Sequence, residues 1–218
     1  MRFIEKTLKN QPKSLAKHLR TPEHSYDNYS NKDDLRLALF SEQHGICCYC
    51  MQRIQSPSAN KMVIEHFLPQ SKFAEHSLDY FNIFASCQGG ANGKQKHLYH
   101  CDESKGDSII SLNPADKSKM DLIKFTGDGK IVTGIKQYDN EIDNILKLNI
   151  QSLREARRVI IVSLENAFSK FKNENVSENF LNKQIEKWNS CTDNFLPELC
   201  QVAIYFLQKK RKQIQHMK

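Results

Sequence analysis

Residues 47–50 read Cys-Cys-Tyr-Cys, and residues 64–71 read Ile-Glu-His-Phe-Leu-Pro-Gln-Ser. Cys47 and Cys50 are separated by two residues, a spacing that lets two thiolates of one tight turn bind the same tetrahedral zinc ion. Further cysteines follow the second stretch and can complete the set of ligands. The two stretches therefore predict a structural zinc knuckle around which this part of the chain folds.

The other two zinc ligands come from a longer segment. Cys87 and Cys101 can supply them, and the loop between them contains His97 and His100, whose imidazoles also suit zinc. The identity of the fourth ligand stays open at this point. Cys48 is expected to be a spare, because its side chain should point away from the ion. A redox C-x2-C pair is a weaker interpretation, since no βαβ pattern surrounds the motif.

Groups suited to metal and acid–base chemistry lie between and beside the cysteines. Glu65 and His66 follow a short apolar run, so one can bind a metal ion while the other acts on a water molecule. Asn82 comes next, and Asp102 and Lys105 follow the last cysteine of the set. Carboxylates are the ligands that a hard ion such as Mg²⁺ or Mn²⁺ prefers, and a histidine titrating near neutrality suits a general base. The pattern indicates a hydrolytic site.

The order of these residues resembles the HNH endonuclease family. The segment 65–71 is similar to the D-H-x2-P-Q-S run of HNH domains in CRISPR-guided nucleases. The resemblance implies that His66 is the general base, that Glu65 binds the catalytic metal ion and that Asn82 orients the loop carrying the base. It also implies a phosphodiester substrate, with DNA expected and RNA an open alternative.

Two departures from the family pattern affect the assignments. Asp102 stands where the family has His or Asn, so its role as a metal ligand follows from its chemistry. The long separation of Cys87 and Cys101 replaces a second C-x2-C pair. Lys105 completes the pattern, and it is expected either to contact a phosphate or to cap the zinc knuckle.

A narrower resemblance extends beyond the motif. Residues 1–6, 42–47 and 153–157 are similar to the PtuB-like HNH proteins of Septu and retron-linked anti-phage systems. That family works with an ATPase subunit of the PtuA type. The resemblance implies an antiviral effector nuclease, and the apolar faces after about residue 139 are expected to dock a partner or a second copy.

The periodicity of apolar residues predicts an α+β fold in three segments. A ββα-metal nuclease core with its zinc knuckle covers 46–135, between an N-terminal arm and helix over 1–45 and a C-terminal helical region over 136–218. The expected elements are a helix over 32–44 that Gly45 ends, strands over 62–64 and 81–85, a hairpin over 123–132, and C-terminal helices of which Pro197 starts the last.

Composition limits the class of protein. The net charge of +7 suits a polyanionic partner, although charge alone is a weak sign. The seven cysteines are an odd number, which argues against a disulfide framework and for a reducing compartment. Neither an apolar run of membrane-spanning length nor a secretory signal is present, so a cytoplasmic protein without a membrane segment is expected. The competing function is a non-catalytic, zinc-stabilised nucleic-acid-binding or adaptor module.

Overall fold

The computed structural model describes residues 1–90, 93, 95–169 and 176–216. Within these residues the fold is α+β and mostly helical, with two small antiparallel sheets. The expected α+β class is therefore confirmed. None of the helices in this part of the chain is both long and apolar enough to span a membrane.

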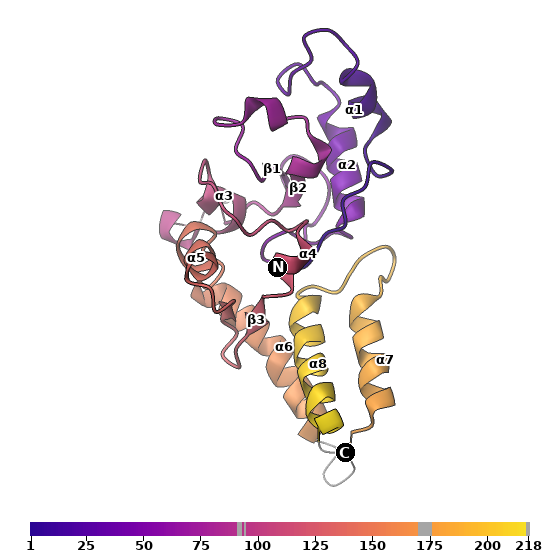
Figure 1. Cartoon of the computed structure of the whole chain (residues 1–218), viewed down its shortest axis with the longest axis vertical. Coiled ribbons are helices and arrows are strands. Elements are labelled where there is room, and N and C mark those ends of the chain that lie inside the picture. The colour runs from indigo at the N-terminus through magenta and orange to yellow at the C-terminus, as the bar shows by residue number, and fades with distance from the viewer. Residues whose placement is uncertain (91–92, 94, 170–175, 217–218) are drawn as a thin grey trace.

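Helices at both ends of the chain enclose a middle part with short strands. In order, the elements are α1 (Lys13–His18), α2 (Lys32–Glu42), β1 (Val63–His66), η1 (Ala74–His76), η2 (Tyr80–Asn82), β2 (Ile83–Ser86), η3 (Lys96–Leu98), α3 (Cys101–Lys105), α4 (Lys117–Met120), β3 (Lys124–Phe125), β4 (Ile131–Val132), α5 (Lys136–Asn140), η4 (Glu141–Ile145), α6 (Gln151–Ser169), α7 (Glu178–Asn189) and α8 (Cys200–His216). Figure 1 shows α1 and α2 at one end of an elongated molecule and the lower parts of α6, α7 and α8 at the other. The strands β1 and β2 lie near α2 and α3 (Figure 1).

The helix predicted over 32–44 is α2, which ends two residues early, at Glu42. Its first turn contains two aspartates, whose charge stabilises the N-terminal end of a helix. Gly45 then has a φ of +70°, and a Cβ added there would lie 2.7 Å from the ring of Phe195. Glycine suits this backbone and this close approach, but the helix ends before it, because Gln43 is the C-cap and His44 already has a φ of +51°.

The strands β1 and β2 pair antiparallel, with Glu65 opposite Phe84. The strands expected over 62–64 and 81–85 exist, but both begin one or two residues later. β1 therefore extends to His66 and includes the acid–histidine pair. The start of β2 is delayed because the preceding residues form the 3-10 helix η2.

The hairpin predicted over 123–132 is β3–β4. The backbone N–H of Thr126 donates to the carbonyl of Lys130 at 2.9 Å and closes the turn. The start of the last helix was predicted wrongly: α8 begins at Cys200, not at Pro197. Leu199 has a φ of +55°, outside the right-handed helical region, and its N–H donates to the carbonyl of Met51 at 3.1 Å.

One hydrophobic core contains buried residues from all three predicted segments, 1–45, 46–135 and 136–218. Arg157 of α6 is fully buried and donates from Nε to the Gly129 carbonyl at 2.6 Å and from Nη2 to the Leu148 carbonyl at 2.7 Å. The first bond joins α6 to the β3–β4 turn, and the second joins it to the segment between η4 and α6. A smaller apolar cluster lies among α6, α7 and α8 and contains Leu164, Leu181, Ala203 and Leu207.

Candidate metal centre and acid–histidine cleft

Four cysteines that are far apart in the sequence lie together in the structure. The sulfur atoms of Cys47, Cys50, Cys87 and Cys101, here called the cysteine cluster, all lie within 4.8 Å of one another. Cys47 is 3.8 Å from Cys101, and Cys50 is 3.7 Å from Cys87. A zinc–sulfur distance of about 2.3 Å places tetrahedral ligands about 3.8 Å apart. The cluster therefore has the spacing that a structural zinc ion requires.

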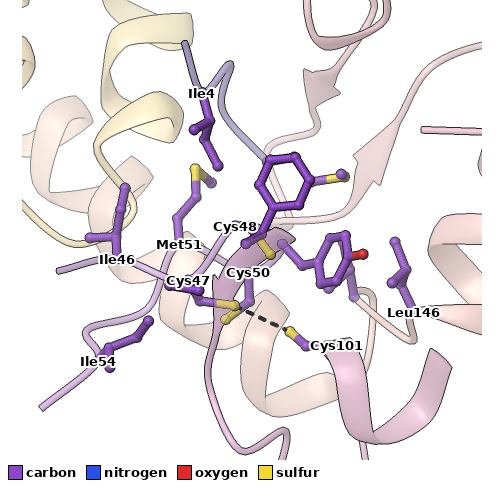
Figure 2. Packing of buried hydrophobic residues seen from close by; sticks show 14 of the residues in the cluster. Ile4, Ile46, Cys47, Cys48, Cys50, Met51, Ile54, Cys101 and Leu146 are labelled. Carbon is purple, nitrogen blue, oxygen red and sulfur yellow. Dashed lines mark hydrogen bonds between the residues drawn. The ribbon is translucent and has the colours of Figure 1, made fainter. Parts of the chain in front are cut away.

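A tight turn presents the first two cysteines. The N–H of Cys47 donates to the Gln52 carbonyl at 3.0 Å, and the N–H of Met51 donates to the Cys47 carbonyl at 3.1 Å. Figure 2 shows the Cys47 and Cys50 sulfur atoms close together and facing Cys101, with the Cys48 side chain apart. Cys48 is outside the cluster, so the expectation that it is a spare is confirmed.

The second pair of cysteines comes from the end of β2 and the start of α3. Cys101 has a φ of +57°, and His100 before it is buried with Nδ1 3.1 Å from the Cys101 sulfur. His97 is exposed. Of the three candidates left open by the sequence, Cys101 belongs to the cluster, while His100 lies beside it as a hydrogen-bonding neighbour.

The thiol of Cys87 is easier to ionise than an ordinary cysteine. A hydrogen bond from Cys101 is the largest cause that lowers the pKa of Cys87, which falls to about 7. Thiolate is the form that binds metal ions. The pKa of Cys47 is also lowered, by hydrogen bonds from its cysteine neighbours, whereas those of Cys50 and Cys101 are raised, so the cluster offers the geometry of a zinc site and two thiols that ionise readily.

A second group of polar residues lies beside the cluster. Glu65 and His66 come from β1, and Asp102 and Lys105 come from one face of α3, because residues three apart on a helix are neighbours. These four residues line a cavity of about 380 Å³, here called the acid–histidine cleft. The remaining lining residues are Val63, Ile64, Pro69, Gln70, Glu103, Gly106 and Asp107.

Glu65 is held by donors on two sides. The Tyr49 hydroxyl donates to its Oε1 at 2.6 Å, and the Lys105 ammonium lies 2.9 Å from the same oxygen. The two charged side chains of the ion pair are only 1% and 2% exposed. Lys105 also donates to the carbonyl of His66 at 2.9 Å. The Lys105 amine is thus bound by Glu65 and by the backbone of His66, within the lining of the cleft.

Asp102 lies against Glu65. Burial, followed by a hydrogen bond with Glu65, raises the pKa of Asp102 to about 9. Two carboxyl groups this close can share a proton, or together they can bind a cation. The donor set consists of hard oxygen ligands, which fit Mg²⁺ or Mn²⁺ and not a thiophilic ion.

The imidazole of His66 has a fixed orientation. Its Nε2–H donates to the Ser77 carbonyl at 2.9 Å, and the ring of Tyr26 packs edge-on with the centroids 4.8 Å apart. Among the residues that the structure describes, Nδ1 has no hydrogen-bond partner. Burial lowers the pKa of His66 to about 4, below the near-neutral value expected from the sequence, so the ring is neutral at pH 7 with Nδ1 unprotonated.

Asn82 supports the loop that follows His66 and does not line the cleft. Its Oδ1 accepts from the N–H of Leu68 at 2.7 Å, while its Nδ2 donates to the carbonyls of Leu68 and His76 at 3.1 Å each. The side chain thus ties the two ends of this loop together. The structure brings the other four predicted residues into one place.

Sequence reasoning missed two side chains that hold this site. Tyr49 lies between the two cysteines of the motif, and that position was a usable signal. Tyr26 lies in a polar stretch without any pattern, so nothing in the sequence singled it out.

Comparison with models of known protein families finds none that matches this chain, and comparison with curated proteins finds no relative. The function must therefore be inferred from the chemistry of the cysteine cluster and of the cleft.

Proposed function

We propose that this protein is a metal-dependent endonuclease of the HNH type, which hydrolyses phosphodiester bonds in DNA. The observation that carries the proposal is the meeting of Glu65, His66 and Asp102 in one cleft. Hydrolysis of a charged and unreactive ester needs a base that activates water and a metal ion that offsets charge. A histidine beside a pair of carboxyl groups can supply the base and the metal ligands.

The local topology supports a ββα-metal core as the finer description of the fold. The hairpin β1–β2 is followed by the short helix α3. His66 lies at the end of the first strand and Asp102 on the helix. The cysteine cluster joins the turn of Cys47 and Cys50, the end of β2 and the start of α3, so a zinc ion there would hold these three segments together.

Glu65 and Asp102 would hold the catalytic ion. Mg²⁺ or Mn²⁺ bound there supplies positive charge that offsets the charge developing on the phosphate and on the leaving oxygen. The buried Lys105 amine stays paired with Glu65 at 2.9 Å.

His66 acts on the attacking water. Because its Nε2–H is bound to the Ser77 carbonyl, the tautomer leaves Nδ1 as the proton acceptor. The water gives its proton to Nδ1 while its oxygen forms a bond to phosphorus and the ester oxygen leaves. Asn82 holds the loop after His66 and so keeps the imidazole in place.

The biological setting follows from the resemblance to PtuB-like proteins. In that setting the chain is the effector nuclease of an anti-phage complex and binds an ATPase subunit of the PtuA type. The net charge of +7 is compatible with DNA as the polyanionic substrate.

One observation favours the alternative of a non-catalytic zinc-stabilised adaptor. The Lys105–Glu65 pair already balances one acidic charge within the protein, as a structural ion pair would. An adaptor needs no base near this pair, whereas the nuclease requires His66.

The test is incubation of the purified protein, with and without its ATPase partner, on supercoiled plasmid DNA and on an RNA of matched length. Nicking that requires Mg²⁺ or Mn²⁺ and stops with a chelator is the expected result. Asp102→Ala should lose activity at low Mn²⁺ and recover part of it in excess Mn²⁺, because the base remains. Intact DNA and RNA in every condition, with zinc bound, would favour the adaptor.

A further inference from the structure

One side chain links the cysteine cluster to the acid–histidine cleft. Tyr49 lies in the tight turn between Cys47 and Cys50, and its hydroxyl donates to Oε1 of Glu65 at 2.6 Å. We infer that Tyr49 is a positioning residue, through which the zinc knuckle orients Glu65 to bind the catalytic metal ion. This inference rests on the proposed role of Glu65 as a metal ligand.

The backbone leaves the Tyr49 ring little freedom. Its side chain is fully buried, and the N–H of Cys48 beside it donates to the Ala85 carbonyl of β2 at 3.0 Å. Ala85 pairs in turn with Ile64, the residue before Glu65 on β1. The turn, β2 and β1 are therefore bonded in series, and the hydroxyl lies at a fixed place relative to Glu65.

The two donors to Glu65 select which oxygen it presents. Tyr49 and Lys105 both contact Oε1, so the hydrogen-bonding capacity of that oxygen is used. Neither donor contacts Oε2, so a cation bound by Oε2 and Asp102 would replace the hydrogen bond between the two carboxyl groups.

The cysteine cluster supports both carboxyl groups, but by different routes. Asp102 directly follows Cys101 in the chain, so the backbone alone connects it to the cluster. Glu65 has no such neighbour in sequence and depends on the Tyr49 hydroxyl. The connection through the Tyr49 hydroxyl can therefore be removed by a substitution that changes no cysteine.

Tyr49→Phe removes one oxygen atom and preserves the ring. We expect the variant to keep its zinc and its fold and to bind Mn²⁺ about 10–100-fold more weakly, as loss of an outer-shell partner does. Cleavage should recover at saturating Mn²⁺. Tyr29→Phe is the matched control, because Tyr29 is also buried and also has one side-chain hydrogen bond, to Ser14 at 2.9 Å.

The experiment measures Mn²⁺ binding to the zinc-loaded full chain by electron paramagnetic resonance without DNA, together with cleavage against Mn²⁺ concentration. Glu65→Gln identifies the site and should abolish this binding. The inference is supported if Tyr49→Phe, and not Tyr29→Phe, raises both the dissociation constant for Mn²⁺ and the Mn²⁺ concentration that gives half-maximal cleavage.

Each other outcome overturns it, and the outcomes are distinguishable. If Glu65→Gln binds Mn²⁺ like wild type, the metal site of the proposed function is wrong and the inference fails with it. If Glu65→Gln abolishes binding but Tyr49→Phe matches wild type, the metal site stands and Tyr49 does not position Glu65. If Tyr49→Phe loses zinc or unfolds while Tyr29→Phe does not, Tyr49 supports the knuckle and not the carboxylate.

Discussion

The cysteine cluster and the acid–histidine cleft are neighbours, yet they are held in shape in opposite ways. The cluster consists of four like side chains from three separate stretches, whose sulfur atoms contact one another and also Ser86, Gln52 and His100. The cleft consists of unlike side chains that satisfy each other, such as Lys105 and Glu65, and it retains a cavity of about 380 Å³. Structural metal sites are closed, whereas catalytic sites keep open positions.

This difference predicts separate consequences of removing each metal ion. Without zinc, nothing offsets the cost of bringing four thiols this close together. The cluster should therefore depend on its ion for folding. The cleft is kept in shape by protein hydrogen bonds, so removal of Mg²⁺ or Mn²⁺ should stop the chemistry and leave the fold intact.

The largest effect is expected from Cys50→Ser. Wild-type protein should contain about one zinc ion per chain, and the variant should lose the ion together with its cooperative thermal unfolding, because zinc binding is coupled to folding. Zinc is measured by elemental analysis and folding by circular dichroism. Cys48→Ala is the matched control from the same turn, and it should keep its zinc. A natively folded wild-type protein without zinc would contradict the claim that the cluster depends on its ion for folding.

His66→Ala should affect only the cleft. We expect cleavage to fall by about 10²–10⁴-fold, the usual contribution of a general base, with zinc content and melting temperature as in wild type. His97→Ala, which changes an exposed histidine, should cleave normally. The rate is measured as plasmid nicking at saturating Mn²⁺. Undiminished nicking by folded His66→Ala would remove the base from the mechanism and leave the adaptor as the better hypothesis.

The sequence predicted more of these two sites than of the surroundings that hold them. Cys47 and Cys50 can be recognised in the sequence because zinc binding requires a particular residue type at a particular spacing. Glu65 and His66 were found because they follow an apolar strand and lie between cysteines. Signals of this kind depend on residues close together in the chain, so the sequence alone shows them.

What the sequence did not reveal depends on contacts between distant residues. The ion pair of Lys105 with Glu65 joins residues 40 positions apart, and the start of α8 depends on a bond from Leu199 to Met51. Pro197 is a sound start signal by itself, but the left-handed conformation of Leu199 overrides it. Tertiary contacts of this kind leave no periodic pattern.

Lys105→Met tests whether the cleft is held by the protein's own charges. Removal of one partner from a buried ion pair commonly costs about 3–5 kcal/mol, so the free energy of unfolding should fall by about this amount in metal-free buffer. Mn²⁺ should restore part of it, because the ion supplies positive charge next to Glu65. Urea denaturation with and without Mn²⁺ measures both values. Lys119→Met, which breaks a partly exposed pair with Asp116, should change little. If Lys105→Met is as stable as wild type, the cleft does not depend on this charge.

The smallest effect on either site is expected from the exposed face of α6. Val159 is 67% exposed and Val162 is 39% exposed, on a helix whose opposite side buries Arg157 and Ile161. We propose this exposed face as the docking surface for the partner proposed above.

Val159→Ser combined with Val162→Ser should therefore weaken capture of the ATPase subunit in a pull-down. The same double variant should shift stability by only about 0.5 kcal/mol, since surface substitutions rarely do more. Zinc content and Mn²⁺-dependent nicking by the isolated chain should match wild type, because neither site includes α6. Ile135→Ser is the control, because Ile135 is also exposed, at 41%, but lies before α5. Equal capture by the double variant and wild type would place the docking surface elsewhere, and an altered zinc content would show that the two sites are not independent of the C-terminal helices.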